Sequence, residues 1–383
     1  MKKRICVVTA SRADYGLLCW LMKAIKESPD LELLTVVTGA HLSRKFGYTI
    51  NEIIRDGFED LVKIKVSDDT SSWGIAASGS QILAKFADFF DRKKIDFLIL
   101  LGDRYEMLAI ALAAMPFNIP IAHIGGGEIS EGAIDDSIRH SLTKLSHLHF
   151  AITKKCAKRI RQMGEEQGRI KVDGSPRLDS KNNMAFRSKG YLNKKYGINF
   201  RGKVMLVVFH PTTLEIDETK KQMANLLKAV EEVNIETVIF YPNMDTNSDI
   251  IIEALKNFAG KRPNIKLLKP LEKQDYFSLL KAVDVLVGNS SIGIVEAPSF
   301  HLAAVNIGNR QKGRDRVGNV IDTDFSPKNI VRAVNKALYN KAFLRILASL
   351  RNPYGDGMAS KRIVNILSRI SMNKFSIVKK NCF

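Results

Sequence analysis

The feature that most constrains the fold is a regular alternation of short apolar runs with amphipathic segments. Apolar runs such as ICVVTA, from Ile5, and DFLILLGD, from Asp96, alternate with segments whose apolar residues recur at helical spacing. A second series begins at KVMLVVFH, from Lys203, and includes VDVLVGNSS, from Val283. Strands that alternate with helices usually pair in parallel. The sequence therefore predicts an α/β protein built from doubly wound sheets.

Length and local composition divide the two series into two domains. The chain has 383 residues, more than one hydrophobic core usually organises. The segment VDGSPRLDS, at residues 172–180, brings glycine, serine and proline together, as domain boundaries often do. We predict two tandem Rossmann-like domains, residues 1–174 and 175–356, with a ligand cleft between them. The last amphipathic helix, within about residues 357–383, could pack back on the first domain.

Composition excludes several classes of protein. Hydrophobic residues make up 45% of the chain and charged residues 26%, and no apolar run approaches the roughly 20 residues that span a bilayer. The first apolar run ends at SRAD, residues 11–14, too soon for a signal peptide. The four cysteines have no CxxC spacing, so we expect neither a zinc site nor a disulfide framework. These features predict a cytoplasmic protein that does not insert into membranes.

The formal charge of +19 raises the alternative of a nucleic-acid partner. Lysine and arginine are spread along the chain, and their densest cluster is KRIVNILSRISMNKFSIVKK, residues 361–380. This cluster contains a single aromatic residue, Phe375, and not the series of interleaved aromatic residues that stack on bases. A solvated basic surface is the simpler interpretation, and we expect no nucleic acid as the main partner.

Polar residues follow the predicted strands at the edge where α/β sheets bind ligands. In the first domain these are SRAD at residues 11–14, GDR at residues 102–104 and GGGE at residues 125–128. In the second domain His210, Asn243 and NSS at residues 289–291 occupy corresponding positions.

The run VDVLVGNSSIGIVEAPSF reads as a buried strand, a polar turn and a helix. Free N–H groups at such a helix start attract anions, and the turn would place Asn289, Ser290 and Ser291 beside them. Gly293 would let a ligand approach the backbone, and Glu296 is spaced to accept hydrogen bonds from ribose hydroxyls. An ordinary serine N-cap with an incidental glutamate explains the same residues.

The first strand leads into TASRADYG and lacks the GxGxxG pattern of dinucleotide-binding proteins, so we expect no NAD. Arg12 in this turn suits a diphosphate instead, because a guanidinium group pairs with phosphate oxygens through two hydrogen bonds. An ion pair of Arg12 with Asp14 or with a neighbouring loop is equally consistent with the sequence.

Several carboxylates could converge on one site at the strand ends of the first domain. The candidates are Asp103, Glu128, Glu131, Asp135 and Asp136. In IDDSIRHSL, the spacing i, i+4 also pairs Asp135 with Arg139 and Asp136 with His140, and we expect a simple ion pair on the helix for at least one of them. His210 would face the same cleft from the second domain, or serve as a structural histidine.

Nine motifs in order carry a resemblance to a known family across nearly the whole chain. They are SRADYG, TGAHLS, FGYT, GDRYE, HIGGGE, IDDSIRHSLTKLSHLHF, GSPRLD, GNSSIGIVEAP and NIGNRQKGR. In this combination the chain resembles the hydrolysing UDP-sugar 2-epimerases of sialic-acid and legionaminic-acid synthesis. The resemblance implies the glycosyltransferase-B architecture, a homodimer, and conversion of UDP-N-acetylglucosamine and water to N-acetylmannosamine and UDP. UDP-N,N′-diacetylbacillosamine is the alternative substrate, and a non-hydrolysing epimerase or a glycosyltransferase of the same fold is the alternative enzyme.

The resemblance also assigns residues. Ser290, Ser291 and Glu296 match phosphate and ribose contacts. Positions that line the UDP pocket are matched by Arg12, Arg104, His210, Asn243 and Arg310. Positions of the acid and base carboxylates are matched by Asp103, Glu128 and Asp136. Some relatives carry a glutamate where this chain has Gly125, which makes Glu128 the candidate in this loop. The arginines and His210 can stabilise the departing phosphates, so no metal is expected.

Overall fold

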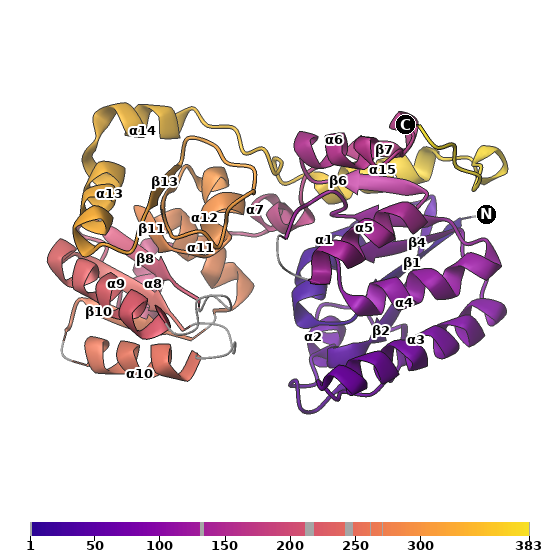
Figure 1. Cartoon of the computed structure of the whole chain (residues 1–383), viewed down its shortest axis with the longest axis horizontal. Coiled ribbons are helices and arrows are strands. Elements are labelled where there is room, and N and C mark those ends of the chain that lie inside the picture. Colours follow the sequence, from indigo (N-terminus) through magenta and orange to yellow (C-terminus); the bar gives the residue numbers. More distant parts are fainter. Residues whose placement is uncertain are drawn as a thin grey trace. The chain divides into compact units, whose positions relative to one another are not determined.

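The structure is a computed structural model that describes residues 2–130, 134–210, 218–241, 248–260, 262–269 and 271–382. The chain divides into two compact units. Unit 1 comprises Met1–Asn182 together with Tyr354–Phe383, and unit 2 comprises Asn183–Pro353. Each unit has a parallel sheet between layers of helices (Figure 1). The predicted fold class, two doubly wound α/β units in tandem, is confirmed.

In unit 1 the described strands form one sheet in the order β3-β2-β1-β4-β5-β6-β7, with every neighbouring pair parallel. The strands are β1 (Lys3–Thr9), β2 (Leu31–Thr38), β3 (Leu61–Ile64), β4 (Phe97–Leu101), β5 (Ile121–Ile124), β6 (Leu148–Ala151) and β7 (Ile170–Val172). The helices are α1 (Arg12–Glu27), α2 (Ile50–Arg55), α3 (Ser72–Arg92), α4 (Tyr105–Ala114), α5 (Ile134–Leu145), α6 (Lys154–Gln162), α7 (Ser180–Asn183) and α15 (Ala359–Arg369).

The strands of unit 1 supply apolar side chains to both faces of the sheet, because successive residues of a strand point to opposite sides. On β1, Ile5 and Val7 pack with α1 and α15, whereas Cys6 and Val8 pack with α3 and α4. Runs that are apolar at every position, such as FLILL in β4, are typical of parallel sheets covered on both faces. The core therefore lies in two layers around β1 and β4.

Helix α15 belongs to unit 1 although it follows unit 2 in the chain. Its Ile363 and Leu367 side chains are fully buried in the core beside α1. The Asp179 carboxylate accepts hydrogen bonds of 2.9 and 2.7 Å from the first backbone N–H groups of this helix. The Lys3 ammonium group donates to three carbonyl oxygens at its last turn and just beyond. Both ends of α15 are thus tied to residues from the first half of the chain.

The glycine- and proline-containing segment at residues 172–180 packs within unit 1. Its 3-10 helix η4 (Pro176–Asp179) precedes Ser180, whose hydroxyl accepts a hydrogen bond of 2.9 Å from the Trp20 indole. The backbone N–H of Ser175 donates to the carbonyl oxygen of Tyr354. The two units consequently divide between residues 182 and 183, a few residues beyond the predicted boundary.

In unit 2 the described strands form a second parallel sheet in the order β10-β9-β8-β11-β12-β13. The strands are β8 (Val204–Val208), β9 (Glu236–Phe240), β10 (Ile265–Leu268), β11 (Val285–Gly288), β12 (Ala303–Ile307) and β13 (Val320–Thr323). The helices are α8 (Lys189–Tyr196), α9 (Thr219–Val233), α10 (Ser248–Ala259), α11 (Lys273–Ala282), α12 (Ile292–Val295), α13 (Pro327–Tyr339) and α14 (Lys341–Ala348).

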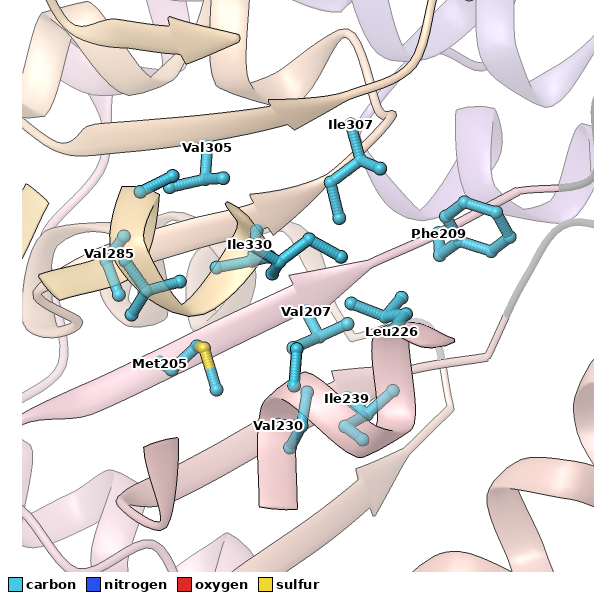
Figure 2. Packing of buried hydrophobic residues seen from close by; sticks show 14 of the residues in the cluster. Met205, Val207, Phe209, Leu226, Val230, Ile239, Val285, Val305, Ile307 and Ile330 are labelled. Atoms are coloured by element: carbon cyan, nitrogen blue, oxygen red, sulfur yellow. The ribbon is translucent and has the colours of Figure 1, made fainter. Parts of the chain in front are cut away.

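One face of this second sheet packs against α9 and α13. Figure 2 shows alternate residues of β8, Met205 and Val207, pointing into this layer, with Phe209 following at the end of the strand. Leu226 and Val230 reach them from α9, and further members come from neighbouring strands and from α13, namely Ile239, Val285, Val305, Ile307 and Ile330. This packing fixes β8 and β11 side by side at the centre of the unit.

Both sheets contain a point at which the strand order reverses, between β1 and β4 in unit 1 and between β8 and β11 in unit 2. In doubly wound sheets, the loops that leave the strands on either side of this point form the ligand site. Residues singled out from the sequence lie in these loops, after β1 and β4 and after β8 and β11. Within the described ranges, no helix is both long and apolar enough to cross a bilayer.

Candidate functional site

A buried arginine gathers the polar loops of unit 1. Arg139 on α5 has a side chain only 4% exposed. Its Nη2 donates to the Asp103 carboxylate and, at 3.0 Å, to the Ser130 hydroxyl. Its Nη1 donates to the Glu128 carbonyl oxygen at 3.0 Å and to Asp136 Oδ1 at 3.4 Å. A buried guanidinium group needs such partners to offset its lost hydration, so Arg139 holds three of the predicted segments together.

Asp103 and Asp136 keep part of their side chains accessible, 29% and 28% respectively. Asp136 Oδ1 also accepts a hydrogen bond of 2.7 Å from the Ser130 backbone, which anchors the loop that follows Glu128. The two carboxylates are therefore fixed in position by buried donors while solvent, or a ligand, can still reach them.

The ion pairs expected on α5 form only in part. His140 Nε2 lies 3.3 Å from Asp136 Oδ2, the predicted i, i+4 pair. Arg139 contacts Asp136 at i, i+3 and reaches back to Asp103, so its described partners differ from the predicted pairing with Asp135. The helix geometry explains this result, because positions three apart also share a face. Glu131, the remaining carboxylate of this group, lies outside the described residues.

His123 on β5 was not predicted from the sequence as a site residue, yet it contacts the turn that contains Asp103. Its ring is fully buried, and Nε2 donates to the Gly102 carbonyl oxygen at 2.7 Å. Burial lowers the pKa of His123 to about 4, so the ring is neutral at pH 7 and carries its proton on Nε2. Nδ1 has no hydrogen-bond partner in the described part of the chain. A histidine within an otherwise apolar strand was the signal that could have identified it.

The glycine loop after β5 runs against α6. Gly127 has a φ of +75°, and a Cβ at this position would lie 2.3 Å from the Cys156 carbonyl oxygen. Only glycine tolerates both the backbone conformation and the close approach. This packing sets the direction in which the chain delivers Glu128 to the neighbourhood of Arg139.

Arg104 begins α4 and forms a second charged cluster. It pairs through two hydrogen bonds, 2.7 and 3.1 Å long, with Glu106, whose side chain is 2% exposed. Burial opposes the charge of Arg104, but Glu106 and Asp14 outweigh it and raise the pKa of the guanidinium group. Asp14 itself is 8% exposed, and burial raises the pKa of its carboxyl group. The sequence presented Asp14 only as a partner for Arg12, whereas its buried position links it to Arg104.

Arg12 forms an ion pair, as one of the two interpretations of the sequence expected, but its partner is neither Asp14 nor a loop residue. Its Nε lies 3.0 Å from a carboxylate oxygen of Glu52 on α2, and its side chain is 63% exposed. An exposed pair of this kind contributes little to stability and can rearrange readily. A role for Arg12 in phosphate binding stays a prediction.

In unit 2 the loops after β8 and β11 are joined by a reciprocal pair of hydrogen bonds. The His210 backbone N–H donates to Asn289 Oδ1, and Asn289 Nδ2 donates to the His210 carbonyl oxygen, both at 2.8 Å. The Asn289 carbonyl oxygen accepts from the Gln311 side chain at 2.9 Å and from Arg310 Nη1 at 3.3 Å. Asn289 is thus the point at which three loops of unit 2 meet.

Gly288 allows the end of β11 to approach the end of β8 closely enough for these hydrogen bonds. Its φ is +140°, and a Cβ there would lie 2.0 Å from the Val208 carbonyl oxygen. The strand end therefore needs a glycine to turn toward β8. The motif GNSS could have indicated this requirement, since a glycine between an apolar run and a polar turn often marks a close backbone approach.

The helix predicted after NSS is present, and it is short. Helix α12 is a single turn of 4 residues, and the 3-10 helix η6 (Ala297–Phe300), with Pro298 near its start, follows it. Proline provides no backbone N–H, so a longer α-helix is not supported here. Ser291 at the start of α12 makes no capping hydrogen bond with its side chain, but the Ser290 hydroxyl accepts one of 3.4 Å from the Ile292 backbone N–H, which agrees with the N-cap interpretation. A helix of one turn also gives weak support to the predicted attraction of an anion to its N-terminus.

Gly293 and Glu296, two of the predicted nucleotide contacts, both lie in or next to α12. A Cβ at Gly293 would lie 3.0 Å from Ala304 Cβ and 3.3 Å from a methyl group of Leu286, so the missing side chain serves packing of α12 on the sheet. The geometry gives Gly293 a role in packing, and its predicted contact with a ligand stays a prediction. Glu296 is 4% exposed at the end of α12. Asn243, also predicted to contact the nucleotide, lies outside the described residues.

The described residues place charged groups suited to acid and base chemistry in unit 1, and a backbone-rich polar turn in unit 2. Within the ranges that the structure describes, no group of three or more histidine, cysteine, aspartate or glutamate side chains is arranged to hold a metal ion. Asp103 and Asp136 combine contact with the buried Arg139 and partial accessibility, as groups that exchange protons with a ligand require.

Known proteins resemble this chain over most of its length. The sequence model of the family described as UDP-N-acetylglucosamine 2-epimerase matches residues 23–368. The UDP-N,N′-diacetylbacillosamine 2-epimerase (hydrolyzing) of Legionella pneumophila is 36% identical over 385 residues, with 100% of both chains covered. The GDP/UDP-N,N′-diacetylbacillosamine 2-epimerase (hydrolyzing) of Campylobacter jejuni is 40% identical over 330 residues, with 85% of both chains covered.

The fold also resembles that of solved structures. The crystal structure of UDP-GlcNAc 2-epimerase from Neisseria meningitidis bound to UDP-GlcNAc matches with a TM-score of 0.78 and 18% sequence identity. The match covers 96% of this chain and 100% of that chain. This likeness agrees with the predicted two-domain α/β architecture.

Proposed function

The chain belongs to the UDP-N-acetylglucosamine 2-epimerase family, and from that premise we propose that it is a hydrolysing UDP-sugar 2-epimerase. The observation that carries the proposal is the convergence of Asp103, Asp136 and the Glu128 loop on Arg139. Inversion at C2 of a sugar removes a proton from one face and returns one to the other. A site with several fixed and accessible carboxylates supports such chemistry.

The proposed reaction has two stages. In the first, a carboxylate removes the proton from C2 of the sugar, and the bond between C1 and the β-phosphate oxygen breaks. The electron pair leaves with UDP, and a double bond forms between C1 and C2. In the second stage, water adds its hydroxyl group to C1, while C2 receives a proton on the face opposite to the one deprotonated. The products are UDP and the free sugar epimerised at C2.

The proposal assigns Asp103, Glu128 and Asp136 to the proton transfers. The proposal gives Glu131, Asp135, Arg139 and His140 a supporting role. The nucleotide is assigned to Arg12, Arg104, His210, Asn243, Asn289, Ser290, Ser291, Gly293, Glu296 and Arg310. Cationic and N–H groups at these positions can stabilise the departing diphosphate, so the proposed mechanism includes neither a metal nor NAD.

For the sugar, we propose UDP-N,N′-diacetylbacillosamine ahead of UDP-N-acetylglucosamine. Both curated relatives described above, at 36% and 40% identity, are named for the diacetylated sugar. The resemblance first favoured UDP-N-acetylglucosamine, and the description of the matching family keeps that sugar as the second candidate. The proposal further includes a cytoplasmic location and a homodimeric state.

The test is to incubate the purified protein with each UDP-sugar separately in ²H₂O and to follow the products by NMR. We expect UDP and a free sugar of inverted C2 configuration that carries deuterium at C2, formed faster from the diacetylated substrate. UDP linked to the epimerised sugar as the end product would instead indicate a non-hydrolysing epimerase. An absolute need for an acceptor would indicate a glycosyltransferase. Salt-sensitive DNA binding without affinity for UDP would favour the nucleic-acid alternative.

A further inference from the structure

Two segments that lie far apart in the sequence hold most of the positive charge of the chain. Residues 144–172, which include α6, contain eight lysines and arginines and two glutamates. Residues 361–382, which include most of α15 and the C-terminal tail (residues 371–382), contain six lysines and arginines and no acidic residue. Together they carry a net charge of +12 out of the formal +19. Both belong to unit 1, where α6, β7 and the C-terminal end of the chain lie on the same side (Figure 1).

Helix α6 turns its charged residues outward. Cys156 and Ile160, four residues apart, are buried and face the interior of unit 1. Each residue of an α-helix advances about 100° around the axis, so Lys154, Lys158 and Arg161 lie on the opposite side. All three are exposed. The outer face of α6 is therefore a row of basic side chains.

The two glutamates of this region already have cationic partners. Glu165 is 2% exposed and accepts hydrogen bonds of 2.6 Å from Lys144 Nζ and 2.9 Å from Lys379 Nζ. Glu166 pairs with Arg169 at 3.2 Å. Because both carboxylates are bound to these groups, they do not neutralise the outer face of α6.

The C-terminal tail holds two apolar side chains in solvent. Val378 is 74% exposed and Ile377 is 36% exposed. The backbone around them is fixed, because Arg169 Nη2 donates to two carbonyl oxygens of this segment at 2.9 and 2.8 Å. The Lys379 ammonium group, which follows directly, is bound inside unit 1. The structure thus presents an apolar pair on an anchored backbone.

The tail and α6 form one continuous surface. The Lys380 backbone N–H donates to Glu166 at 2.7 Å, and the Cys382 backbone N–H donates to the Gly164 carbonyl oxygen at 3.0 Å, just beyond the end of α6. The exposed Lys374 and Lys380 flank the apolar pair in the sequence. We call the following set the α6–tail surface: Lys154, Lys158 and Arg161 of α6, with Lys374, Ile377, Val378 and Lys380 of the tail.

The composition of the α6–tail surface fits an anionic membrane. Lysine and arginine side chains are attracted to negatively charged headgroups, and exposed apolar side chains enter the boundary between headgroups and acyl chains. A nucleic acid would contact the basic residues but would leave Ile377 and Val378 in water. Phe375 is also not free to stack on bases, because its ring packs against Phe97 with the centroids 5.1 Å apart.

A protein partner fits this surface less well. The centre of a stable protein interface is apolar and depleted of charge, whereas here only Ile377 and Val378 interrupt a basic surface. A second copy of the chain would bring like charges together. The charge and the small apolar tip therefore favour a lipid surface.

We propose that the α6–tail surface binds the surface of anionic phospholipid membranes, with its basic residues at the phosphates and with Ile377 and Val378 inserted among the headgroups. The proposal goes beyond the enzymatic function and does not depend on which sugar is accepted. Gly164 and Glu166 precede β7, so the tail lies at the amino edge of the sheet. The loops after β4 and β5, which carry Asp103 and Glu128, leave the opposite edge and stay open to solution.

The test measures co-sedimentation of the full chain with lipid vesicles. The vesicles are phosphatidylcholine with about 30% phosphatidylglycerol, and pure phosphatidylcholine vesicles serve for comparison. We expect binding to the anionic vesicles alone, weakened when salt rises from about 0.1 M to about 0.5 M. Absence of binding to the anionic vesicles at the lower salt concentration, or equal binding to both kinds of vesicle, would overturn the proposal.

The double variant Lys158→Gln, Arg161→Gln tests the basic face. Each charge lost near an anionic surface weakens binding about fivefold, so the dissociation constant should rise about 25-fold. The matched control is Lys336→Gln, Arg345→Gln, which removes the same charge from exposed positions of α13 and α14 in unit 2. It should bind vesicles as the wild type does. An equal loss in both double variants would reduce the effect to net charge and contradict the assigned surface.

The double variant Ile377→Ser, Val378→Ser tests the apolar tip. Both side chains are exposed, so the fold should be retained, which thermal unfolding would verify. We expect about tenfold weaker binding to anionic vesicles, since two apolar side chains no longer enter the membrane. Binding to a DNA duplex, measured by fluorescence anisotropy, should be unaffected. Undiminished vesicle binding by this variant, or DNA bound more tightly than vesicles by the wild type, would assign the surface to a polyanion and not to a membrane.

Discussion

The side-chain amide of Asn289 and the backbone of His210 exchange two hydrogen bonds of 2.8 Å each. This pair joins the ends of β8 and β11, the two strands on either side of the point at which the strand order reverses. Because Asn289 is 1% exposed, solvent cannot replace either bond. The shape of the proposed nucleotide site in unit 2 consequently depends on one amide group.

Asn289→Asp should therefore disturb both stability and UDP binding. The substitution turns the Nδ2 donor into an oxygen that faces the His210 carbonyl oxygen, so one hydrogen bond becomes a repulsion. We expect a loss of about 1–3 kcal/mol in the free energy of unfolding, and at least tenfold weaker binding of UDP at about 1.4 kcal/mol per factor of ten. Urea unfolding and calorimetric titration with UDP would measure the two effects.

Asn264→Asp is the matched control for this prediction. Asn264 also donates its amide to a carbonyl oxygen, that of Ile235, at 3.1 Å, but it lies before β10, at the opposite edge of the same sheet. Its replacement should leave UDP affinity unchanged. Equal UDP affinities for Asn289→Asp and the wild type would remove Asn289 from the proposed site.

Arg139→Met should separate catalysis from nucleotide binding. Without the guanidinium group, Asp103 and Asp136 lose the cation that both of them contact, and the Glu128 carbonyl oxygen loses a donor. We expect kcat to fall by about a hundredfold or more, while UDP affinity, assigned mainly to unit 2, changes little. Arg4→Met, which removes an exposed ion pair with Glu32, should retain full activity. A normal kcat in Arg139→Met would show that the carboxylates act without this common partner.

Glu128→Gln and Asp136→Asn should each lower turnover by about 10²–10⁴-fold, the usual contribution of a placed acid or base. Deuterium incorporation distinguishes their roles. Loss of the base abolishes exchange at C2 together with release of UDP, whereas loss of the acid lets the unsaturated sugar accumulate after UDP has left. Glu32→Gln provides an exposed carboxylate as the control. Full turnover by Glu128→Gln would contradict its assignment.

Stability should decline as the pH falls from about 6.5 toward 4. Burial lowers the pKa of His41, His123 and His147 to about 4, against 6.5 for the free side chain. Below pH 6.5 the unfolded chain binds three protons that the folded chain does not, so the folded state loses stability as the pH falls. Asp173 acts in the opposite sense, because burial raises its pKa to about 6 and the folded state binds that proton. For these four groups alone, the net difference of two protons corresponds to about 2.7 kcal/mol per pH unit near pH 5.

Urea unfolding at pH 7.5, 6 and 5 would measure how the free energy of unfolding changes with pH. The variant His147→Asn would show how much of that change is due to His147. His147 Nδ1 accepts a hydrogen bond of 3.1 Å from the Ile121 backbone, and an asparagine oxygen can take the same position without titrating. The variant should lower the slope by about 1.4 kcal/mol per pH unit. A free energy of unfolding that stays constant between pH 7.5 and 5 would contradict the buried neutral histidines.

The fold was predictable from the sequence because it depends on local patterns. Runs such as FLILL are typical of buried strands in a sheet covered on both faces, and the polar turns that follow parallel strands lie at one edge of the sheet. The length of α12 was not predictable from the apolar spacing alone, since Pro298 ends the regular helix soon after it starts. Likewise, the segment at residues 172–180 has the composition of a linker, yet its Asp179 caps α15 from far along the chain.

The members of the candidate site were predictable as residue types, but their partners were not. The spacing on α5 predicted an ion pair between Arg139 and Asp135. In the structure, Arg139 instead donates a hydrogen bond to Asp103, which lies 36 residues earlier. Such a contact depends on how β4, β5 and α5 pack, which no short pattern contains. Buried supports such as His123 and Asp14 were missed for the same reason, because their importance follows from burial and not from sequence context.

The return of α15 to unit 1 has a consequence for synthesis on the ribosome. Unit 2 is one uninterrupted stretch, Asn183–Pro353, and all of it leaves the ribosome before Ile363 and Leu367 appear. Unit 2 can therefore complete its core first. Until α15 arrives, the apolar residues of α1 that it covers in unit 1 stay exposed to solvent. Translation that stops short of α15 would yield a finished second unit attached to an unfinished first one, a natural target for chaperones and proteases.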